Sequence, residues 1–251
     1  EAAPATAAAH GVIDEAGTHP VDQQLHVNTQ KDIPPPPPPG PENPPGPPPP
    51  PPPRRKAFRE ANRDAHPGWH NAPVPSFGGD DAALLIVGLA PGLKGANLTG
   101  RPFTGDFAGD LLYASLRKFG FSEGDYDARP DDGLKLLNCR ITNAVRCVPP
   151  QNKPLGAETR ACGQFLRDEI AGLGRLRVIL ALGTLAHGAV LAALELKKSA
   201  WKFAHGALHH LPGGLILADS YHCSRYNTNT RRLTEAMFEA VFEVIRERLS
   251  G

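Results

Sequence analysis

The sequence predicts an α/β fold, a three-layer αβα arrangement in which a central parallel sheet of four strands lies between two layers of helices. Three observations predict it. Short, continuously apolar runs, such as residues 82–90, are typical of parallel strands that are buried on both faces. Segments with apolar residues at helical spacing alternate with these runs along the chain. Glycine-rich or polar loops follow several of the runs, which is where open α/β sheets bind ligands.

The individual elements follow from the same patterns, taken in chain order. Residues 82–90 form the first expected strand, because nearly every residue in the run is apolar. The first expected helix covers residues 106–120, where Leu112, Leu116 and Phe119 recur at helical spacing. The remaining expected elements are strands over residues 136–145, 178–182 and 215–218, and helices over residues 157–173, 184–194 and 231–249.

Residues 1–53 differ in composition from the rest of the chain. Of the 28 prolines, 16 lie within residues 34–53. Such a segment buries too little apolar surface to offset its ordering entropy, so we expect residues 1–53 to be a disordered Ala/Pro-rich segment. It reads as a linker, as a ligand for proline-binding domains, or as a mis-started or frame-shifted reading. The folded domain is expected to span residues 54–251.

Charge and composition exclude several classes of protein. From residue 54 onward there are 26 basic and 20 acidic residues, a balance that suits a phosphate-bearing partner. The longest apolar run, residues 178–194, is interrupted by Gly183, His187 and Gly188 and reads better as a strand and a helix than as a membrane span. No signal peptide is recognisable, and four cysteines do not suggest a disulfide scaffold. A cytoplasmic protein is expected.

The carboxyl ends of parallel strands share one edge of a sheet, so the loops at residues 90–106, 143–155 and 219–230 should meet there. The first loop is rich in glycine, but it lacks the Gly-Lys-Ser/Thr ending of a phosphate-binding loop and the glycine spacing of a dinucleotide site. By itself it fits a tight turn equally well. In the second loop, Asn143 offers an acceptor and two donors. The third loop offers a histidine, hydroxyls, an arginine and a tyrosine.

Four motifs in these loops together resemble family 5, the type-b branch, of the uracil-DNA glycosylase superfamily. They are GLAPG at residues 88–92, GANLTGRPFTGD at 95–106, ITNAVRCVPPQNKP at 141–154 and SYHCSRYNTNT at 220–230. The resemblance spans residues 54–249. It implies a uracil-DNA glycosylase-like fold and a DNA repair enzyme that hydrolyses the N-glycosidic bond of uracil, and of other deaminated bases, after flipping the base out of the helix.

The resemblance also implies roles for individual residues. Phe103 matches the aromatic residue that stacks on the flipped base, and Asn143 matches the amide that reads its polar edge. His222 matches the histidine that stabilises negative charge on the departing base. Asp106 matches the carboxylate that orients water or stabilises a cationic sugar. The remaining expected substrate-binding residues are Gly88, Leu89, Ala90, Pro91, Gly92, Asn97, Ser224, Arg225 and Tyr226.

Simpler interpretations of these residues stay open on the sequence alone. Asp106 also suits a helix N-cap, Phe103 a core position, and Asn143 a satisfied buried amide. Arg225 and Tyr226 are candidates for a wedge inserted into the duplex. No lysine matches a site position, so water rather than an amine is the expected nucleophile. The candidate phosphate contacts are Lys94, Arg101, Lys153, Arg231 and Arg232.

The cysteines depart from the pattern of this family, which holds a [4Fe–4S] cluster on four thiolates. Cys147 and Cys162 match one pair of metal ligands, 15 residues apart. The other pair should lie just before Ala57, where this sequence has prolines and arginines. We therefore expect the cluster to be incomplete or lost, unless the natural protein has a cysteine pair upstream of Ala57.

Three alternatives to an active enzyme follow. One is a DNA-binding module that lost its activity together with its cluster. The others are an iron–sulfur or redox protein and a proline-rich scaffold. The expected partner in the main interpretation is DNA that contains uracil or other deaminated bases, bound by a monomer without membrane contact. In a prokaryote the protein would be associated with the nucleoid.

Overall fold

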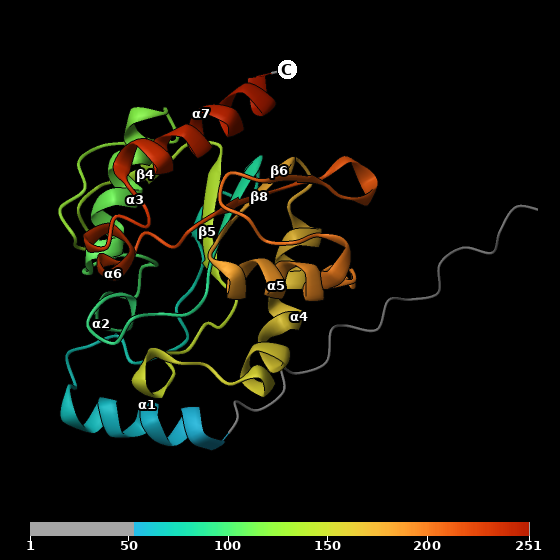
Figure 1. The fold of residues 1–251 in the computed structure, drawn as a ribbon. Coiled ribbons are helices and arrows are strands. Elements are labelled where there is room, and N and C mark those ends of the chain that lie inside the picture. The colour runs from blue at the N-terminus through green and yellow to red at the C-terminus, as the bar shows by residue number, and fades with distance from the viewer. Residues whose placement is uncertain (1–52, 251) are drawn as a thin grey trace, which may run out of the picture. The chain divides into compact units, whose positions relative to one another are not determined.

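The computed structural model describes residues 53–250, so the predicted disordered segment lies outside the described residues except for Pro53. The centre of the described part is a six-stranded sheet of order β1-β5-β2-β6-β8-β7. Its four inner strands are parallel to one another, and the two edge strands run antiparallel to their neighbours. The sheet with helices on both faces confirms the predicted fold class (Figure 1).

The number of strands is larger than the four expected. The four inner strands are the predicted ones: β2 (Leu84–Gly88), β5 (Cys139–Asn143), β6 (Val178–Leu182) and β8 (Ile216–Ser220). The two additional strands, β1 (Phe77–Gly78) and β7 (Leu208–His210), have two and three residues, too few to show a periodic pattern. A separate hairpin pairs β3 (Ser122–Glu123) with β4 (Lys135–Leu136).

The four predicted helices are present with small shifts of their ends, and residues 53–250 contain three further α-helices that were not predicted. The α-helices are α1 (Pro53–Ala65), α2 (Ala96–Thr99), α3 (Phe107–Lys118), α4 (Gly156–Gly172), α5 (Thr184–Ala193), α6 (Arg225–Asn229) and α7 (Glu235–Ser250). The last helix begins later than residue 231 because the Thr234 hydroxyl accepts a hydrogen bond from the backbone N–H of Met237 at 3.2 Å, in the manner of an N-cap. Short α6 occupies part of the third predicted loop.

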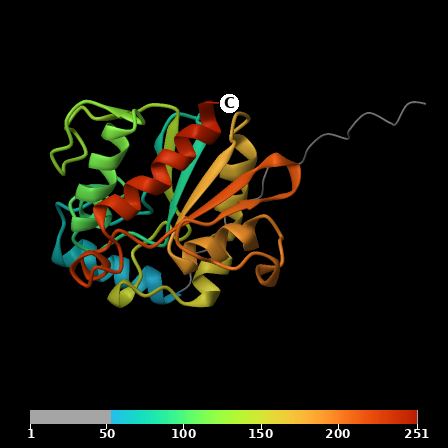
Figure 2. The ribbon, with the colours of Figure 1, turned by 45° about the horizontal axis from the view of Figure 1, so that its top comes forward.

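Alternation along the inner strands explains the layers. Leu84 and Ile86 of β2 belong to the core that packs against α3 and α7. Leu85 and Val87 belong to the opposite core, which packs against α4 and α5. Because successive side chains of a strand point to opposite faces, a continuously apolar strand requires helices on both sides. Figure 2 shows α7, in red, crossing one face of the sheet.

The edge strand β7 pairs with β8, and a buried polar contact adds to this pairing. The buried carboxylate of Asp219 in β8 accepts hydrogen bonds from His187 Nδ1 of α5 at 2.7 Å and from His209 Nε2 of β7 at 2.9 Å. The contact of β7 itself, between His209 and Asp219, joins residues ten positions apart. Among residues 53–250, no helix is long and apolar enough to cross a membrane.

Candidate active site

The loops that follow β2, β5 and β8 enclose a cavity of about 650 Å³. This is the edge of the sheet at which the three loops were expected to meet, because the carboxyl ends of parallel strands lie together there. The lining residues come from all three loops: Leu89, Ala90, Pro91, Gly92, Ala96, Phe103, Gly105, Asp106, Phe107, Ala108, Asn143, Asn152, His222, Ser224 and Arg225.

Asp106 is both a helix cap and a cavity residue. Its Oδ1 accepts hydrogen bonds from the backbone N–H groups of Ala108 at 3.1 Å and Gly109 at 3.3 Å, which begins α3. Its Oδ2 lies so close to Gly95 that a Cβ there would be 2.4 Å away, so glycine is required at this position. Burial raises the pKa of Asp106 in spite of the two backbone hydrogen bonds.

Phe103 forms one wall of the cavity from an unusual backbone conformation. Its φ is 53°, in the left-handed region that non-glycine residues seldom adopt. The ring packs over Gly88, where a Cβ would lie 2.6 Å from Phe103 Cζ. Its centroid is 5.8 Å from that of His222. Phe103 is only 6% exposed and belongs to the core cluster on the α3 side, so it joins the core to the cavity.

Asn143 ends β5 and pairs with Gly88 in the parallel ladder. A Cβ on Gly88 would lie 2.4 Å from Asn143 Oδ1, so this second glycine makes room for the amide as well as for the phenyl ring. Asn143 is 7% exposed, and its side chain has no hydrogen-bond partner among residues 53–250. A buried amide without partners that borders a cavity is available to a ligand.

His222 follows β8 on the opposite side of the cavity. Its carbonyl accepts a hydrogen bond from Asn227 Nδ2 at 2.8 Å, which fixes the backbone. Its ring has no hydrogen-bond partner in the described part of the chain, and burial lowers the pKa of His222 to about 4. The imidazole is therefore neutral at pH 7, with one N–H to donate and one nitrogen to accept.

Most of the predicted substrate-binding residues line the cavity, but three do not. Gly88 lies beneath Phe103 and Asn143, as described. Asn97 is fully buried, and its Nδ2 donates to Asn71 Oδ1 at 3.0 Å, so it ties α2 to the segment between α1 and β1 and does not line the cavity. Tyr226 lies on α6, is 72% exposed, and stands outside the cavity.

One predicted phosphate contact is wrong. Arg101 is buried, and its guanidinium makes two hydrogen bonds to Asp132, so it is not free to bind DNA. Sequence reasoning also missed five lining residues: Ala96, Gly105, Phe107, Ala108 and Asn152. Asn152 Oδ1 accepts from the backbone N–H of Leu93 at 3.2 Å, and Phe107 lies under the Arg225 guanidinium, 5.2 Å from it. Asn152 lies within one of the quoted motifs and Phe107 directly follows another, so both could have been named as candidates from the position of the motifs.

The residues near Cys147 and Cys162 do not fit a four-thiolate cluster. Arg59 Nη1 lies 3.5 Å from Cys147 Sγ, and Arg55 Nη1 lies 3.1 Å from Cys162 Sγ. Guanidinium groups therefore stand where further thiolates would be needed. In residues 53–250, no three cysteines lie close enough together to hold one metal group.

The other two cysteines lie elsewhere in the fold. Cys139 is on the buried strand β5, and Cys223 Sγ donates to the carbonyl of Ala108 at 3.3 Å. Burial raises the pKa of both thiols, which disfavours the thiolate form that a metal requires. No step of the chemistry considered below passes through a cluster.

Comparison with known proteins places this geometry in a family. The family model described as the uracil DNA glycosylase superfamily matches residues 75–246. A type-5 uracil-DNA glycosylase of Thermus thermophilus is 48% identical over 200 residues, covering 79% of this chain and 87% of the relative. A type-5 uracil-DNA glycosylase of Pyrobaculum aerophilum is 41% identical over 174 residues, covering 69% and 74%. The chain therefore belongs to the uracil-DNA glycosylase superfamily and, within it, to the type-5 family.

Proposed function

We propose that this protein is a DNA repair hydrolase that removes uracil from DNA by cleaving the bond between the base and its sugar. The observation that carries the proposal is the placement of an unpaired amide, an unpaired neutral imidazole and a carboxylate around one cavity, beside a phenyl ring. The inactive DNA-binding module is not favoured, because all four of these side chains are present and border the cavity.

The flipped base enters the cavity and stacks on Phe103. The Asn143 amide then hydrogen-bonds the polar edge of uracil, which presents both carbonyl oxygens and an N–H. When the glycosidic bond breaks, its electron pair stays with the base, and negative charge grows on the base oxygens. The neutral His222 imidazole donates its N–H to that charge, and no further reorganisation of the site is needed.

Asp106 serves the sugar side of the reaction. Its Oδ1 is committed to the helix cap, but its Oδ2 has no hydrogen-bond partner among residues 53–250. A carboxylate at this position stabilises the cationic sugar or orients the attacking water. Water completes the reaction by adding hydroxide to the sugar and a proton to the departing base, so the products are free uracil and an abasic site.

The remaining assignments concern the DNA. Arg225 and Tyr226 on α6 form the wedge that fills the gap left by the flipped base, since Arg225 lines the cavity and Tyr226, the next residue, is a large, exposed aromatic residue. The phosphates of the DNA are contacted by Lys94, Lys153, Arg231 and Arg232.

The protein acts as a monomer in the cytoplasm, and in a prokaryote it is associated with the nucleoid. It works without a cluster and also accepts other deaminated bases.

Excision from a labelled duplex with one U·G pair tests this function. We expect the protein to produce alkali-sensitive cleavage at the uracil, and His222→Ala to lower the single-turnover rate at least about a hundredfold, as loss of a donor to a developing anion does. His210→Ala is the matched control, because His210 is exposed on β7, away from the cavity. Binding without excision by the unaltered protein would overturn the proposal.

A further inference from the structure

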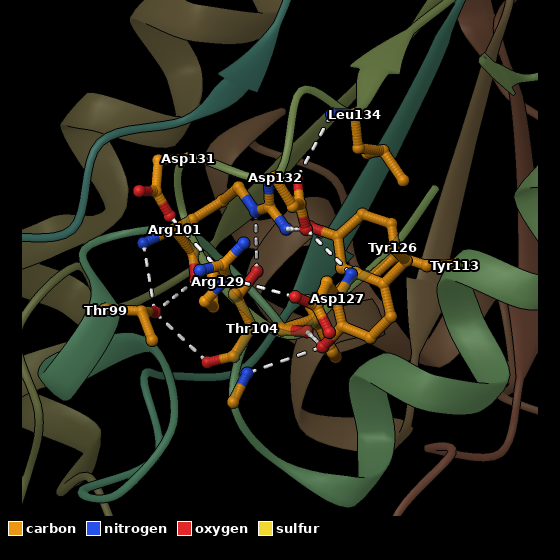
Figure 3. A network of polar contacts seen from close by, with 12 residues as sticks. Thr99, Arg101, Thr104, Tyr113, Tyr126, Asp127, Arg129, Asp131, Asp132 and Leu134 are labelled. Carbon is orange, nitrogen blue, oxygen red and sulfur yellow. Dashed lines mark hydrogen bonds and ion pairs between the residues drawn. The ribbon is translucent and has the colours of Figure 1, made fainter. Parts of the chain in front are cut away.

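The segment of residues 101–105 carries Phe103 and leads directly into Asp106, yet it belongs to no helix or strand. A loop in this position would normally be free to move. Here, a set of side chains from outside the segment holds it at successive residues. Figure 3 shows this network, which joins the segment to α3 and to the loop between β3 and β4.

The centre of the network is a buried ion pair. The Arg101 Nη1 and Nη2 atoms donate to the Asp132 Oδ1 and Oδ2 atoms at 2.7 and 2.6 Å, and the two side chains are 5% and 1% exposed. Arg101 holds the pKa of Asp132 well below its ordinary range. The backbone N–H groups of Asp127 and Leu134 also donate to the carboxylate, at 3.0 and 3.1 Å. The loop that carries Asp132 is therefore closed around the pair.

Three aromatic rings surround the guanidinium. Its carbon lies 5.1, 5.4 and 5.7 Å from the ring centroids of Phe77, Tyr113 and Tyr126. Tyr113 and Tyr126 stack on each other with their centroids 4.5 Å apart. A cation enclosed by π faces and paired with a bidentate carboxylate has little freedom, because moving it would expose or unpair several groups together.

The two tyrosine hydroxyls extend the network to the backbone of the segment. Tyr113 donates to the carbonyl of Pro102 at 2.7 Å. Tyr126 donates to the carbonyl of Phe103 at 3.2 Å and accepts from the backbone N–H of Gly105 at 3.4 Å. The Tyr126 hydroxyl thus joins the residues on either side of Thr104, whose own hydroxyl accepts from Arg101 Nε at 2.8 Å.

Phe103 needs such support because its left-handed backbone is costly for a residue with a side chain. Gly109, in the first turn of α3, makes room for the arrangement. A Cβ at Gly109 would lie 1.9 Å from the carbonyl oxygen of Phe103 and 2.5 Å from the Tyr126 hydroxyl. The conformation of Phe103 and the position of the Tyr126 hydroxyl therefore both depend on the absence of a side chain at Gly109.

We propose that Tyr126 and the Arg101–Asp132 pair are positioning residues, which fix the Phe103 ring and the Asp106 carboxylate through the backbone of residues 101–105. The inference rests on the proposed function for its catalytic consequence. None of the three side chains lines the cavity, so each acts through the residues that do. The loop between β3 and β4 then takes part in catalysis without contacting the substrate.

Tyr126→Phe tests the proposal, because it removes one hydroxyl and keeps the stacked ring. We expect the single-turnover excision rate to fall roughly tenfold, since small misplacements of reacting groups are costly, while affinity for the uracil duplex changes less than about twofold. Tyr221→Phe is the matched control, because the Tyr221 hydroxyl has no hydrogen-bond partner among residues 53–250. Its rate should equal that of the unaltered protein.

Two further measurements separate positioning from stability. If Tyr126 acts through Phe103, Tyr126→Phe should slow excision much less in a Phe103→Ala background than in the unaltered protein. A purely structural role would instead lower the melting temperature and slow both backgrounds equally. Asp132→Asn, which unpairs the buried Arg101, should slow excision more than Tyr126→Phe, but at a clear cost in melting temperature.

Hydrogen exchange distinguishes failure of this inference from failure of the proposed function. In Tyr126→Phe, amides of residues 103–106 should exchange faster, and those of β2 should be unchanged. If the unaltered protein leaves uracil in place, the proposed function fails, and faster exchange still supports the positioning of the segment. An unchanged excision rate in Tyr126→Phe, or unchanged exchange, would overturn the inference.

Discussion

The cavity and the cysteine pair are the two regions to which the family resemblance assigns ligands, and they differ in what their side chains contact. In the cavity, the Asn143 amide and the His222 ring have no hydrogen-bond partner within residues 53–250. At the other region, an arginine of α1 faces the sulfur of each of Cys147 and Cys162. The cysteine region also has buried atoms without a hydrogen-bond partner in the described part of the chain, namely Arg55 Nε, Arg59 Nε and Glu158 Oε1, but it packs charged groups against one another, with Arg55 Nε 3.7 Å from Glu158 Oε1. The Asn143 and His222 side chains instead border a cavity that a ligand can fill.

The cysteine region instead resembles a structural link between α1 and α4. Glu158, buried in the first turn of α4, lies 3.3 Å from Arg54 and 3.7 Å from Arg55. Its Oε2 also accepts from the backbone N–H of Leu155 at 2.8 Å, which stabilises the start of the helix. Charges of opposite sign lie side by side here, whereas burial is the main influence on the pKa of Asp106 in the cavity.

The largest expected effect concerns Asp106, whose Oδ1 caps α3 and whose Oδ2 is available to the sugar or the attacking water. Asp106→Asn keeps an N-cap acceptor but removes the charge, so we expect excision to fall at least about a hundredfold with little loss of stability. Burial raises the pKa of Asp106, which means that the charged form is less stable in the folded protein than in the unfolded chain. Removing that charge should therefore leave the melting temperature at pH 7 unchanged or raise it.

Asp106→Ala is the matched comparison, because it removes the cap as well as the charge. It should lose activity to a similar degree and in addition lose about 1 kcal/mol of stability. Single-turnover excision and thermal unfolding of the two variants measure the two effects separately. Full activity in Asp106→Asn would show that this carboxylate only caps α3.

A smaller effect is expected from pH, and its direction follows from the two titrating groups. The active forms are the Asp106 carboxylate and the neutral His222 imidazole, and both are lost on the acid side. Because burial raises the pKa of Asp106 and lowers that of His222 to about 4, excision should fall on the acid side, and protonation of His222 should contribute to the fall only near pH 4. Single-turnover rates between pH 4 and 8 measure this. If Asp106→Asn, which lacks the carboxylate, keeps an acid midpoint near 6.5, the ordinary value for histidine, the buried neutral state of His222 would be contradicted.

The sequence predicted the structural features that are set by neighbouring residues. It missed the contacts between residues that lie far apart in the chain. The four inner strands were predicted because burial on both faces makes each an apolar run. Arg101 was read as a phosphate contact because an arginine in a glycine-rich loop resembles an exposed one. Its partner Asp132 is 31 residues away, and nothing local in the sequence points to it.

The same limit applies inside the motifs. Asn97 and Asn143 both lie in motifs of the family, and the sequence alone places both at the site, Asn143 as a catalytic residue and Asn97 as a substrate-binding one. In the fold, Asn97 is buried outside the cavity, where its Nδ2 donates to Asn71, 26 residues away, and its Oδ1 has no partner among residues 53–250, whereas Asn143 borders the cavity. Tertiary contacts determine which of two asparagines in the family motifs can bind a ligand. A motif therefore identifies candidate residues, and the structure shows which of them reach the cavity.

The smallest expected effect concerns iron: removing it should change nothing, and that result would sharpen the comparison between the cavity and the cysteine pair. If arginines have replaced the missing thiolates, the purified protein should contain no stoichiometric iron, and an iron chelator should change neither its melting temperature nor its excision rate. Metal binding contributes to folding free energy, so a cluster-dependent protein would lose stability in the same test. Iron should be measured on protein prepared without oxygen, since a cluster destroyed in air would give the same result. Four irons per chain would show that other groups complete the site, and α1 would then have to move Arg55 and Arg59 away from the two sulfurs.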